Sequence, residues 1–400
     1  MSKSETEHLY TQKLFPIVNN ADHLDFRIHP NLKGQIDLSN VLLHFTITTP
    51  NAADHPGTKM RGQNYVGPKQ FSSVEVRING EAVTRRSCAN EYFLSSYFQY
   101  SSNYSIDYQV SACRPVGIFD PIAATTPKIE NMATSTKNGF DQARTSPGGN
   151  AEYEILMPID STIFYSNDLL PSNTAIDISF ERTSAKLSCV ACKNGTESDS
   201  SIDLKDVYLA VPFKRSPEVF EQERIAMTKP IKIKYDDYVI RRYNLPKGSK
   251  NIMLSNLISG PLPEKLFWGI QTMDSYSGSF HSSSTLFNRQ GMIKANLYRD
   301  GKEADDYPVN MTSSHVIEPF VKYLENTNQQ LNGFLSRTLC DREFENYHFL
   351  LSKSFNPNEI GTLSFEFDFE STVSEDLVLI TCGLYNKTLK LDNHRNFQII

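Results

Sequence analysis

Cys189 and Cys192 are separated by two residues, which is the spacing found in half of a structural zinc site. Such a site needs four ligands, and no second pair of cysteines or histidines stands at a usable distance downstream. The nine histidines are scattered along the chain and include no His-x-His step. The sequence therefore predicts no bound metal and no cofactor.

Acidic residues occur in adjacent pairs, Asp236 with Asp237 and Asp305 with Asp306. In a strand, neighbouring side chains point to opposite faces, so the two carboxylates of such a pair cannot easily act on one substrate atom. There is no Gly-x-Ser-x-Gly nucleophile motif and no Gly-x4-Gly-Lys phosphate-binding loop. We expect no catalytic residues, and we interpret the chain as a protein that is not an enzyme.

The composition is that of a globular chain, with 39% hydrophobic and 22% charged residues in a length of 400. A net charge of -6 and a pI near 5.9 argue against a protein whose main task is to neutralise phosphates. The polar start of the sequence predicts no cleaved signal peptide, and no apolar run is long enough to span a membrane. Six cysteines in this length suit a reducing compartment.

Two similar stretches then indicate what organises the chain. Val74–Val83 and Ala295–Ala304 each carry alternating apolar residues that run into a two-residue turn, Asn79-Gly80 in the first and Asp300-Gly301 in the second. Asn-Gly and Asp-Gly steps between such residues are the strongest short-range sign of a β-hairpin. The sequence predicts two hairpin turns, at Asn79, Gly80, Asp300 and Gly301, with positive φ at each glycine.

The order of features after each hairpin also repeats. An aromatic segment that could form a helix follows in both halves (90–103 and 313–328), and then come a loop-rich stretch, an alternating strand and a last apolar strand. Chance can produce two hairpins, but it does not explain why the later features keep their order. We interpret this order as a duplication, with domains at 1–215 and 231–400 joined by a linker at 216–230.

The many short, β-branched and aromatic segments predict an all-β fold of two tandem jelly-roll (β-sandwich) domains with short helices and long inserted loops. Strand pairing alone would also allow an immunoglobulin-like sandwich, but units near 190 residues are large for that fold. Ile36–Thr48 is expected to be strand-like throughout. The lone tryptophan, Trp268, is expected in the core, and the lysine-bearing segment 229–237 is expected at a sheet edge.

Five segments of the second half are specific enough for comparison with known families: Leu245–Phe280, "LYRDGKEA", "NYHFLLS", "GTLSFEFDF" and the closing Lys390–Ile400. In these segments the second half resembles the double jelly-roll major capsid proteins of the Polinton (Maverick) and adintovirus group of double-stranded DNA viruses. In the first half, "IDLSNVLLHFTI", "SSVEVRINGEAV", "SNTAIDISFER" and "DVYLAVPF" are similar to the corresponding family segments. The loop at 105–150 has no counterpart in this comparison.

The resemblance implies a major capsid protein that forms pseudo-hexameric homotrimers, hexon-like blocks that tile an icosahedral viral shell. Its partners would be neighbouring capsomers and the penton and minor capsid proteins, without tight binding of nucleic acid. Its place would be the virion capsid, after assembly inside the host cell. The resemblance leaves open whether a membrane lies beneath the shell and whether assembly takes place in the nucleus or the cytoplasm.

Other functions fit the same sequence. A secreted or cytosolic β-sandwich protein that binds carbohydrate or another ligand is compatible with the fold, because a fold does not fix a function. A jelly-roll enzyme of the cupin type is disfavoured by the missing histidine pair. A minor capsid or penton protein is disfavoured by the presence of two units.

Overall fold

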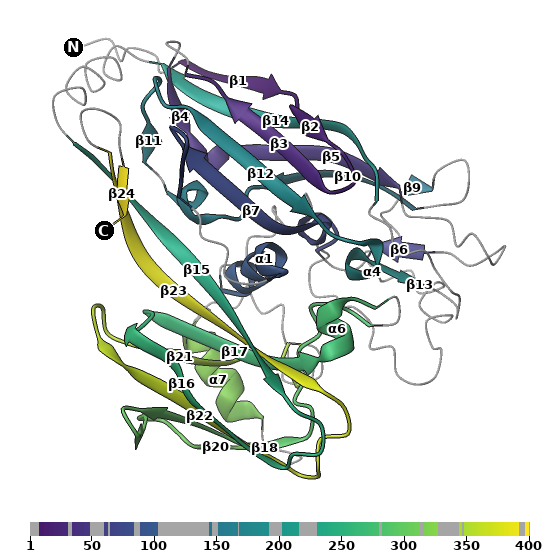
Figure 1. Ribbon diagram of the computed structural model, residues 1–400, viewed down its shortest axis with the longest axis vertical. Helices are drawn as coiled ribbons and strands as arrows, with labels where there is room; N and C mark the ends of the chain where they lie inside the picture. Colours follow the sequence, from purple (N-terminus) through teal and green to yellow (C-terminus); the bar gives the residue numbers. More distant parts are fainter. Residues whose placement is uncertain are drawn as a thin grey trace.

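A computed structural model describes residues 8–30, 34–48, 60–62, 65–83, 89–102, 144–145, 151–166, 168–191, 202–215, 230–279, 282–311, 316–326, 344–345, 348–391 and 397–399. These residues form two β-sandwich units, which lie one above the other along the longest axis of the molecule (Figure 1). Within them, no helix is long and apolar enough to cross a membrane.

The first unit is built mainly from short strands. These are β1 (His8–Leu14), β2 (Val18–Asn19), β3 (His23–Ile28), β4 (Gln35–Asp37), β5 (Leu42–Thr48), β6 (Met60–Gly62), β7 (Phe71–Ile78), β8 (Glu81–Ala82), β9 (Arg144–Thr145), β10 (Ala151–Pro158), β11 (Leu169–Leu170), β12 (Ile176–Arg182), β13 (Cys189–Ala191) and β14 (Leu204–Arg215). Its helices are α1 (Glu91–Ser102) and α4 (Ala185–Ser188), with 3-10 turns η1 (Leu38–Asn40), η2 (Pro68–Gln70) and η4 (Thr162–Tyr165).

The second unit repeats this plan. Its strands are β15 (Ile231–Leu245), β16 (Asn251–Pro261), β17 (Lys265–Thr272), β18 (Met292–Arg299), β19 (Lys302–Glu303), β20 (Val309–Asn310), β21 (Leu351–Ser354), β22 (Ile360–Phe369), β23 (Leu377–Leu391) and β24 (Phe397–Ile399). The longest of them, β15 and β23, have 15 residues each. Its helices are α6 (Met273–Ser277) and α7 (Ile317–Asn326).

The two units share one strand order. In the first, β1-β14-β5-β10 forms one sheet and β3-β12-β7-β8 the other. In the second, β15-β23-β17-β21 and β16-β22-β18-β19 form the corresponding sheets. Each of these eight strands of the first unit thus has a counterpart at the same place in the second, and α1 and α7 occupy the same point in the chain order. The helices expected at 90–103 and 313–328 are confirmed.

The segment Ile36–Thr48 is not one continuous strand. The 3-10 turn η1 separates β4 from β5. The carboxylate of Asp37 accepts hydrogen bonds from the Ser39 hydroxyl (2.8 Å) and from the Asn40 side-chain amide (3.1 Å). These local bonds compete with hydrogen bonding between strands and stabilise a turn. The alternation of apolar residues in the sequence did not predict this turn.

The hydrophobic cores of the two units are connected. Ile233 and Tyr235 of β15 and Leu389 and Leu391 of β23 belong to the core of the first unit, although both strands lie in a sheet of the second. Figure 1 shows this long two-stranded ribbon running from the lower unit up beside the upper one. The predicted linker, 216–230, lies outside the described residues apart from Pro230.

Strand β17 is buried on both faces. Trp268 is 1% exposed and packs near Phe365 of the facing sheet, with ring centroids 5.1 Å apart, which confirms its prediction as a core residue. On the other face, a side chain at Gly269 would collide with Phe287 and Leu350. A strand covered on both sides is expected to be a continuous apolar run, and six consecutive residues of β17 are buried.

We predict that Gly301→Val destabilises the fold by about 1–3 kcal/mol, because Gly301 has φ +77 and open space around its Cα, so that only backbone strain opposes a side chain. Denaturant unfolding measures the loss. Lys302→Val, which places the same side chain on the next residue in a strand, serves as the control. Equal stability of both variants would contradict the turn geometry.

Candidate functional site: the junction between the two units

The residues predicted as turns occupy equivalent hairpins. Asn79 and Gly80 have φ values of 52 and 89 and connect β7 to β8, while Asp300 and Gly301 have 49 and 77 and connect β18 to β19. Both turns therefore place two successive residues at positive φ, as the type I′ hairpin requires.

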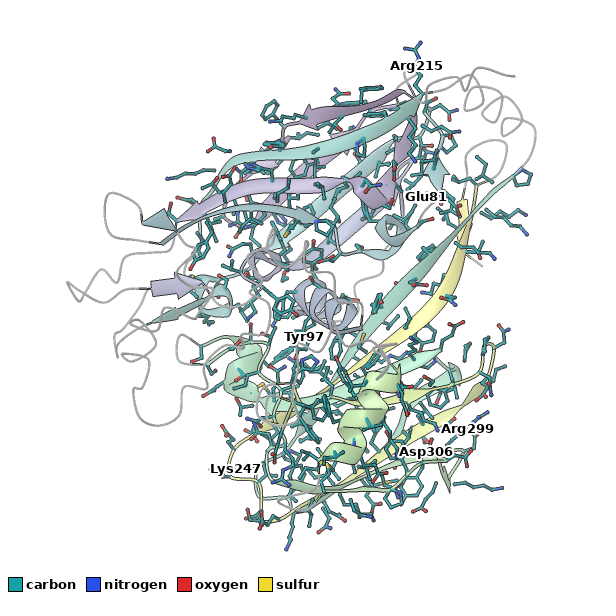
Figure 2. All side chains as sticks on the ribbon, turned by 180° about the vertical axis from the view of Figure 1, so that it is seen from behind. Glu81, Tyr97, Arg215, Lys247, Arg299 and Asp306 are labelled. Atoms are coloured by element: carbon teal, nitrogen blue, oxygen red, sulfur yellow. The ribbon has the colours of Figure 1, made fainter. Side chains whose placement is uncertain are left out.

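Each turn is also hydrogen-bonded to a later segment of its unit, at Ala175 just before β12 and at Thr362 within β22. The backbone N–H of Asn79 donates to the Ala175 carbonyl (2.9 Å), and the Ala175 N–H donates to Oδ1 of Asn79 (3.0 Å). In the second unit, Asp300 makes the same two bonds with Thr362, at 2.9 and 2.8 Å. Both hairpins lie at the same side of the molecule, marked by Glu81 and Arg299 in Figure 2. They are structural clamps, and their bonds are made within the chain.

Helix α1 joins the units. It belongs to the first half of the chain, and its Tyr92 packs in the first core. Its next turns belong to the second core, where Phe93, Leu94, Tyr97 and Phe98 are buried. Tyr97 lies centrally between the units in Figure 2. This helix is therefore a wedge of aromatic side chains from one unit inserted in the other.

A histidine of the second unit is hydrogen-bonded to helix α1. His348 lies between Tyr97 of α1 and Tyr323 of α7: its Nδ1 is hydrogen-bonded to the Tyr97 hydroxyl, and its Nε2 is 2.6 Å from the Tyr323 hydroxyl. In a neutral imidazole one ring nitrogen donates and the other accepts, so both hydroxyls can be satisfied at once. The Tyr97 ring also stacks on Phe287, with centroids 5.3 Å apart.

The protonation state of this histidine follows from its burial. Removal from water disfavours the imidazolium and lowers the pKa of His348 to about 3. His348 is therefore neutral at physiological pH, and the Tyr-His-Tyr bridge carries no net charge.

A buried lysine of the first unit also makes hydrogen bonds to the second unit. Lys69 of η2 is 0% exposed, and its ammonium donates hydrogen bonds to the hydroxyls of Ser283 (3.3 Å) and Thr285 (3.1 Å) in the second unit. Burial of an ammonium is costly unless it is hydrogen-bonded. These bonds therefore favour the one relative position of the two units in which they can form.

Further bonds between the units involve backbone atoms. The Asn90 side-chain amide donates to the Tyr276 carbonyl (3.0 Å), and the Tyr276 hydroxyl donates to the Ala89 carbonyl (2.8 Å). The Ser284 hydroxyl donates to the Leu187 carbonyl (2.9 Å). These hydrogen bonds can hold the two units in one relative position, and the polar groups that make them are occupied by this contact.

The residues that suggested chemistry in the sequence do not come together. Cys189 is buried in β13, and Cys192 lies outside the described residues. Asp237 pairs with Lys387, and Asp306 is 3.0 Å from Lys353, a contact that lowers the pKa of Asp306. Among the described residues, no three His, Cys, Asp or Glu side chains form a group that could hold a metal ion.

Sequence reasoning missed the residues that matter most at the junction, Tyr97, His348 and Lys69. No motif marks them, because each acts through a partner more than 200 residues away in the chain. The aromatic content of the helix at 90–103 was visible, and it was the one available indication that this helix buries more than one face.

No protein-family model matches the sequence, and no curated protein sequence matches it. Solved structures do match. A chain of the Sputnik virophage structure has a TM-score of 0.63 at 11% identity, over 100% of this chain and 89% of that one. The Vp54 protein of the virus PBCV-1, fitted into a reconstruction of Sputnik, has a TM-score of 0.62 at 10% identity, over 100% and 98%. The mavirus major capsid protein has a TM-score of 0.56 at 9% identity, over 98% and 91%.

The fold is a double jelly roll. The predicted all-β fold class is confirmed, and these matches favour the jelly roll over the immunoglobulin-like alternative.

We predict that acid destabilises the folded chain partly through His348. Its pKa is about 3 when folded and about 6.5 when exposed, so the unfolded chain binds the extra proton between these values. The neutral His348 contributes fully to the free energy of unfolding above pH 6.5. Below pH 6 this free energy falls by about 1.4 kcal/mol for each unit by which the pH drops.

Denaturant unfolding at several pH values between 6 and 4 measures this slope. His348→Gln should show a flatter slope than the wild type by one proton. His23→Gln, at an exposed histidine, is the control substitution. Parallel curves for the wild type and His348→Gln would show that this histidine does not titrate as described.

We predict that Phe98→Ala lowers the free energy of unfolding by about 3–5 kcal/mol, since its 1% exposed ring packs against Phe287 in the second core. Limited proteolysis would reveal loosening of the second unit although the substituted residue belongs to the first. Phe98→Leu, which keeps an apolar side chain at the same position, is the control and should lose less stability. Increased proteolysis confined to the first unit would contradict the packing of α1 in the core of the second unit.

Proposed function

We propose that this chain is a major capsid protein, a structural and non-catalytic protein of a virion shell. The observation that carries the proposal is the duplicated jelly roll over the full chain, which matches viral capsid chains over 98–100% of its length. Sequence identity near 10% means that this likeness supports the fold directly and the role by analogy.

The duplication supports a particular assembly. Three copies of a chain with two similar units present six jelly rolls around one threefold axis, so a homotrimer approximates sixfold symmetry. Such pseudo-hexameric blocks pack side by side in a near-hexagonal lattice and tile an icosahedral shell. We propose that 1–215 and 231–400 act as the two units of one block, and that the clamps at Asn79-Gly80 and Asp300-Gly301 hold equivalent hairpins in both.

The junction supports the same assembly mechanically. A tile transmits force between its neighbours, and two units joined only by a flexible linker would rotate relative to each other. Here α1 and the β15–β23 ribbon each pack in the core of the opposite unit. We infer that each chain enters the trimer as one rigid body.

The further proposals follow from the resemblance described above. The chain is assigned to the Polinton (Maverick) and adintovirus group, its partners are neighbouring capsomers with the penton and minor capsid proteins, and it is assembled inside the host cell. No tight contact with nucleic acid is part of this role.

The oligomeric mass of the purified protein tests the proposal. Size exclusion with light scattering should give about 136 kDa, three times the 45.4 kDa chain. Negative-stain images of that peak should show hexagonal outlines. A stable monomer at all concentrations would overturn the capsid role and favour a ligand-binding β-sandwich.

A further inference from the structure

We propose that a basic surface on the β15–β23 ribbon docks on an acidic sheet face of a second copy of this chain, an inference that rests on the proposed trimer. The lysine face consists of Lys232, Lys234 and Lys390. The acidic face consists of Glu303, Glu366 and Asp368.

The lysine face points away from the protein. On β15, Ile233 and Tyr235 are buried in the first core, so the alternate residues Lys232 and Lys234 face outward and are exposed. Lys390 stands directly opposite Lys232 on the neighbouring strand, and its flanking residues Leu389 and Leu391 are buried. Directly opposed residues share one face, so the three ammonium groups gather on the outer side of the ribbon.

These charges are not neutralised within the described part of the chain. No ion pair to any of the three lysines occurs among the residues that the structure describes. Asp168 lies close, but its carboxylate accepts from the backbone N–H of Lys234 (3.2 Å). Asp236 follows on the same face, and its pKa is raised, first by burial and then by Glu264.

Such an arrangement is unfavourable in an isolated chain. Like charges directly opposite each other on neighbouring strands are destabilising, and Lys232 and Lys234 are only about 6.6 Å apart along the strand. Carboxylates from outside would relieve this repulsion. We therefore infer that the outer side of the ribbon is a contact surface for carboxylates of another molecule.

The same chain carries a surface of opposite sign. On β22, the buried residues Leu363, Phe365 and Phe367 alternate with outward-facing side chains that include Glu366 and Asp368. Glu303 of β19 joins them through the side-chain amide of Asn296 (2.8 Å). Lys294 is the cation of this cluster, 3.9 Å from both Glu366 and Asp368, so three carboxylates face one ammonium.

The two surfaces suit a ring. A threefold trimer uses a heterologous contact, in which one patch of each copy meets a different patch of the next, so each chain must carry two complementary surfaces. The lysine face lies on the ribbon beside the first unit, and the acidic face lies on the outer sheet of the second unit (Figure 1). Complementary charges on separate surfaces fix the register of such contacts.

Nucleic acid is the less favoured partner. Binding to a phosphate backbone needs many cationic contacts, and this face offers three on a chain of net charge -6. The acidic face, in contrast, supplies three carboxylates against the single ammonium of Lys294.

The test compares charge-reversal variants by light scattering over a range of protein and salt concentrations. Lys232→Glu, Lys234→Glu and Lys390→Glu together should weaken trimer formation by about 100-fold or more, because like-charge contacts cost several kcal/mol. The control reverses Lys13, Lys205 and Lys247, which are exposed and belong to neither of the two faces, and gives the same net charge of -12. The control should stay trimeric.

A second variant adds Glu366→Lys and Asp368→Lys to the lysine-face triple. This swap restores opposite signs and should recover the trimer. If the triple does not fold, replacement of the same lysines by glutamine should give a trimer whose stability no longer falls with added salt, unlike that of the wild type.

The outcomes separate the two proposals. A wild-type monomer overturns the trimer itself. A wild-type trimer that survives the triple, or a swap that fails to recover it, overturns the charge pairing alone. Unchanged trimer with loss of binding to a duplex DNA probe assigns the lysines to nucleic acid and also overturns the pairing.

Discussion

The structure depends on an exchange of apolar surface between its two halves. Helix α1 of the first unit places Phe93, Tyr97 and Phe98 in the second core, and the β15–β23 ribbon of the second unit places Ile233 and Leu389 in the first. Neither core is complete without residues from the other half. Because burial of aromatic side chains dominates core energetics, separation of the units would expose large apolar areas to water. The polar bridges through His348 and Lys69 then select one relative orientation.

Duplication is visible at the level of single hydrogen bonds. Asn79 and Asp300 occupy equivalent turns and clamp equivalent strands through the same pair of backbone and side-chain bonds. The amide oxygen of Asn79 and the carboxylate oxygen of Asp300 accept from equivalent backbone N–H groups, those of Ala175 and Thr362, so the geometry tolerates either residue. The units have diverged where they meet: α1 is a wedge with Tyr97 in the other unit, whereas α7 supplies Tyr323 to its own unit.

Much of the fold could be predicted from the sequence because its determinants are local. Asn-Gly and Asp-Gly steps define the hairpins, alternation defines β12 and β22, and repetition of their order indicates two units. The break between β4 and β5 was missed because Asp37 bonds to its own neighbours, a competition that hydrophobic periodicity does not record. The junction was missed for a different reason. Its contacts join residues such as Tyr97 and His348, whose proximity is a product of the tertiary fold.

The claim that the two halves form one cooperative block is tested most directly by native-state hydrogen exchange of the intact chain. Amides of β7, α1 and β17 sample the first core, the wedge and the second core. We expect all three to exchange through one opening reaction with the same free energy, because neither core survives without the other. If the β17 amides open at a much lower free energy while those of β7 stay protected, the two units fold independently and the account is wrong.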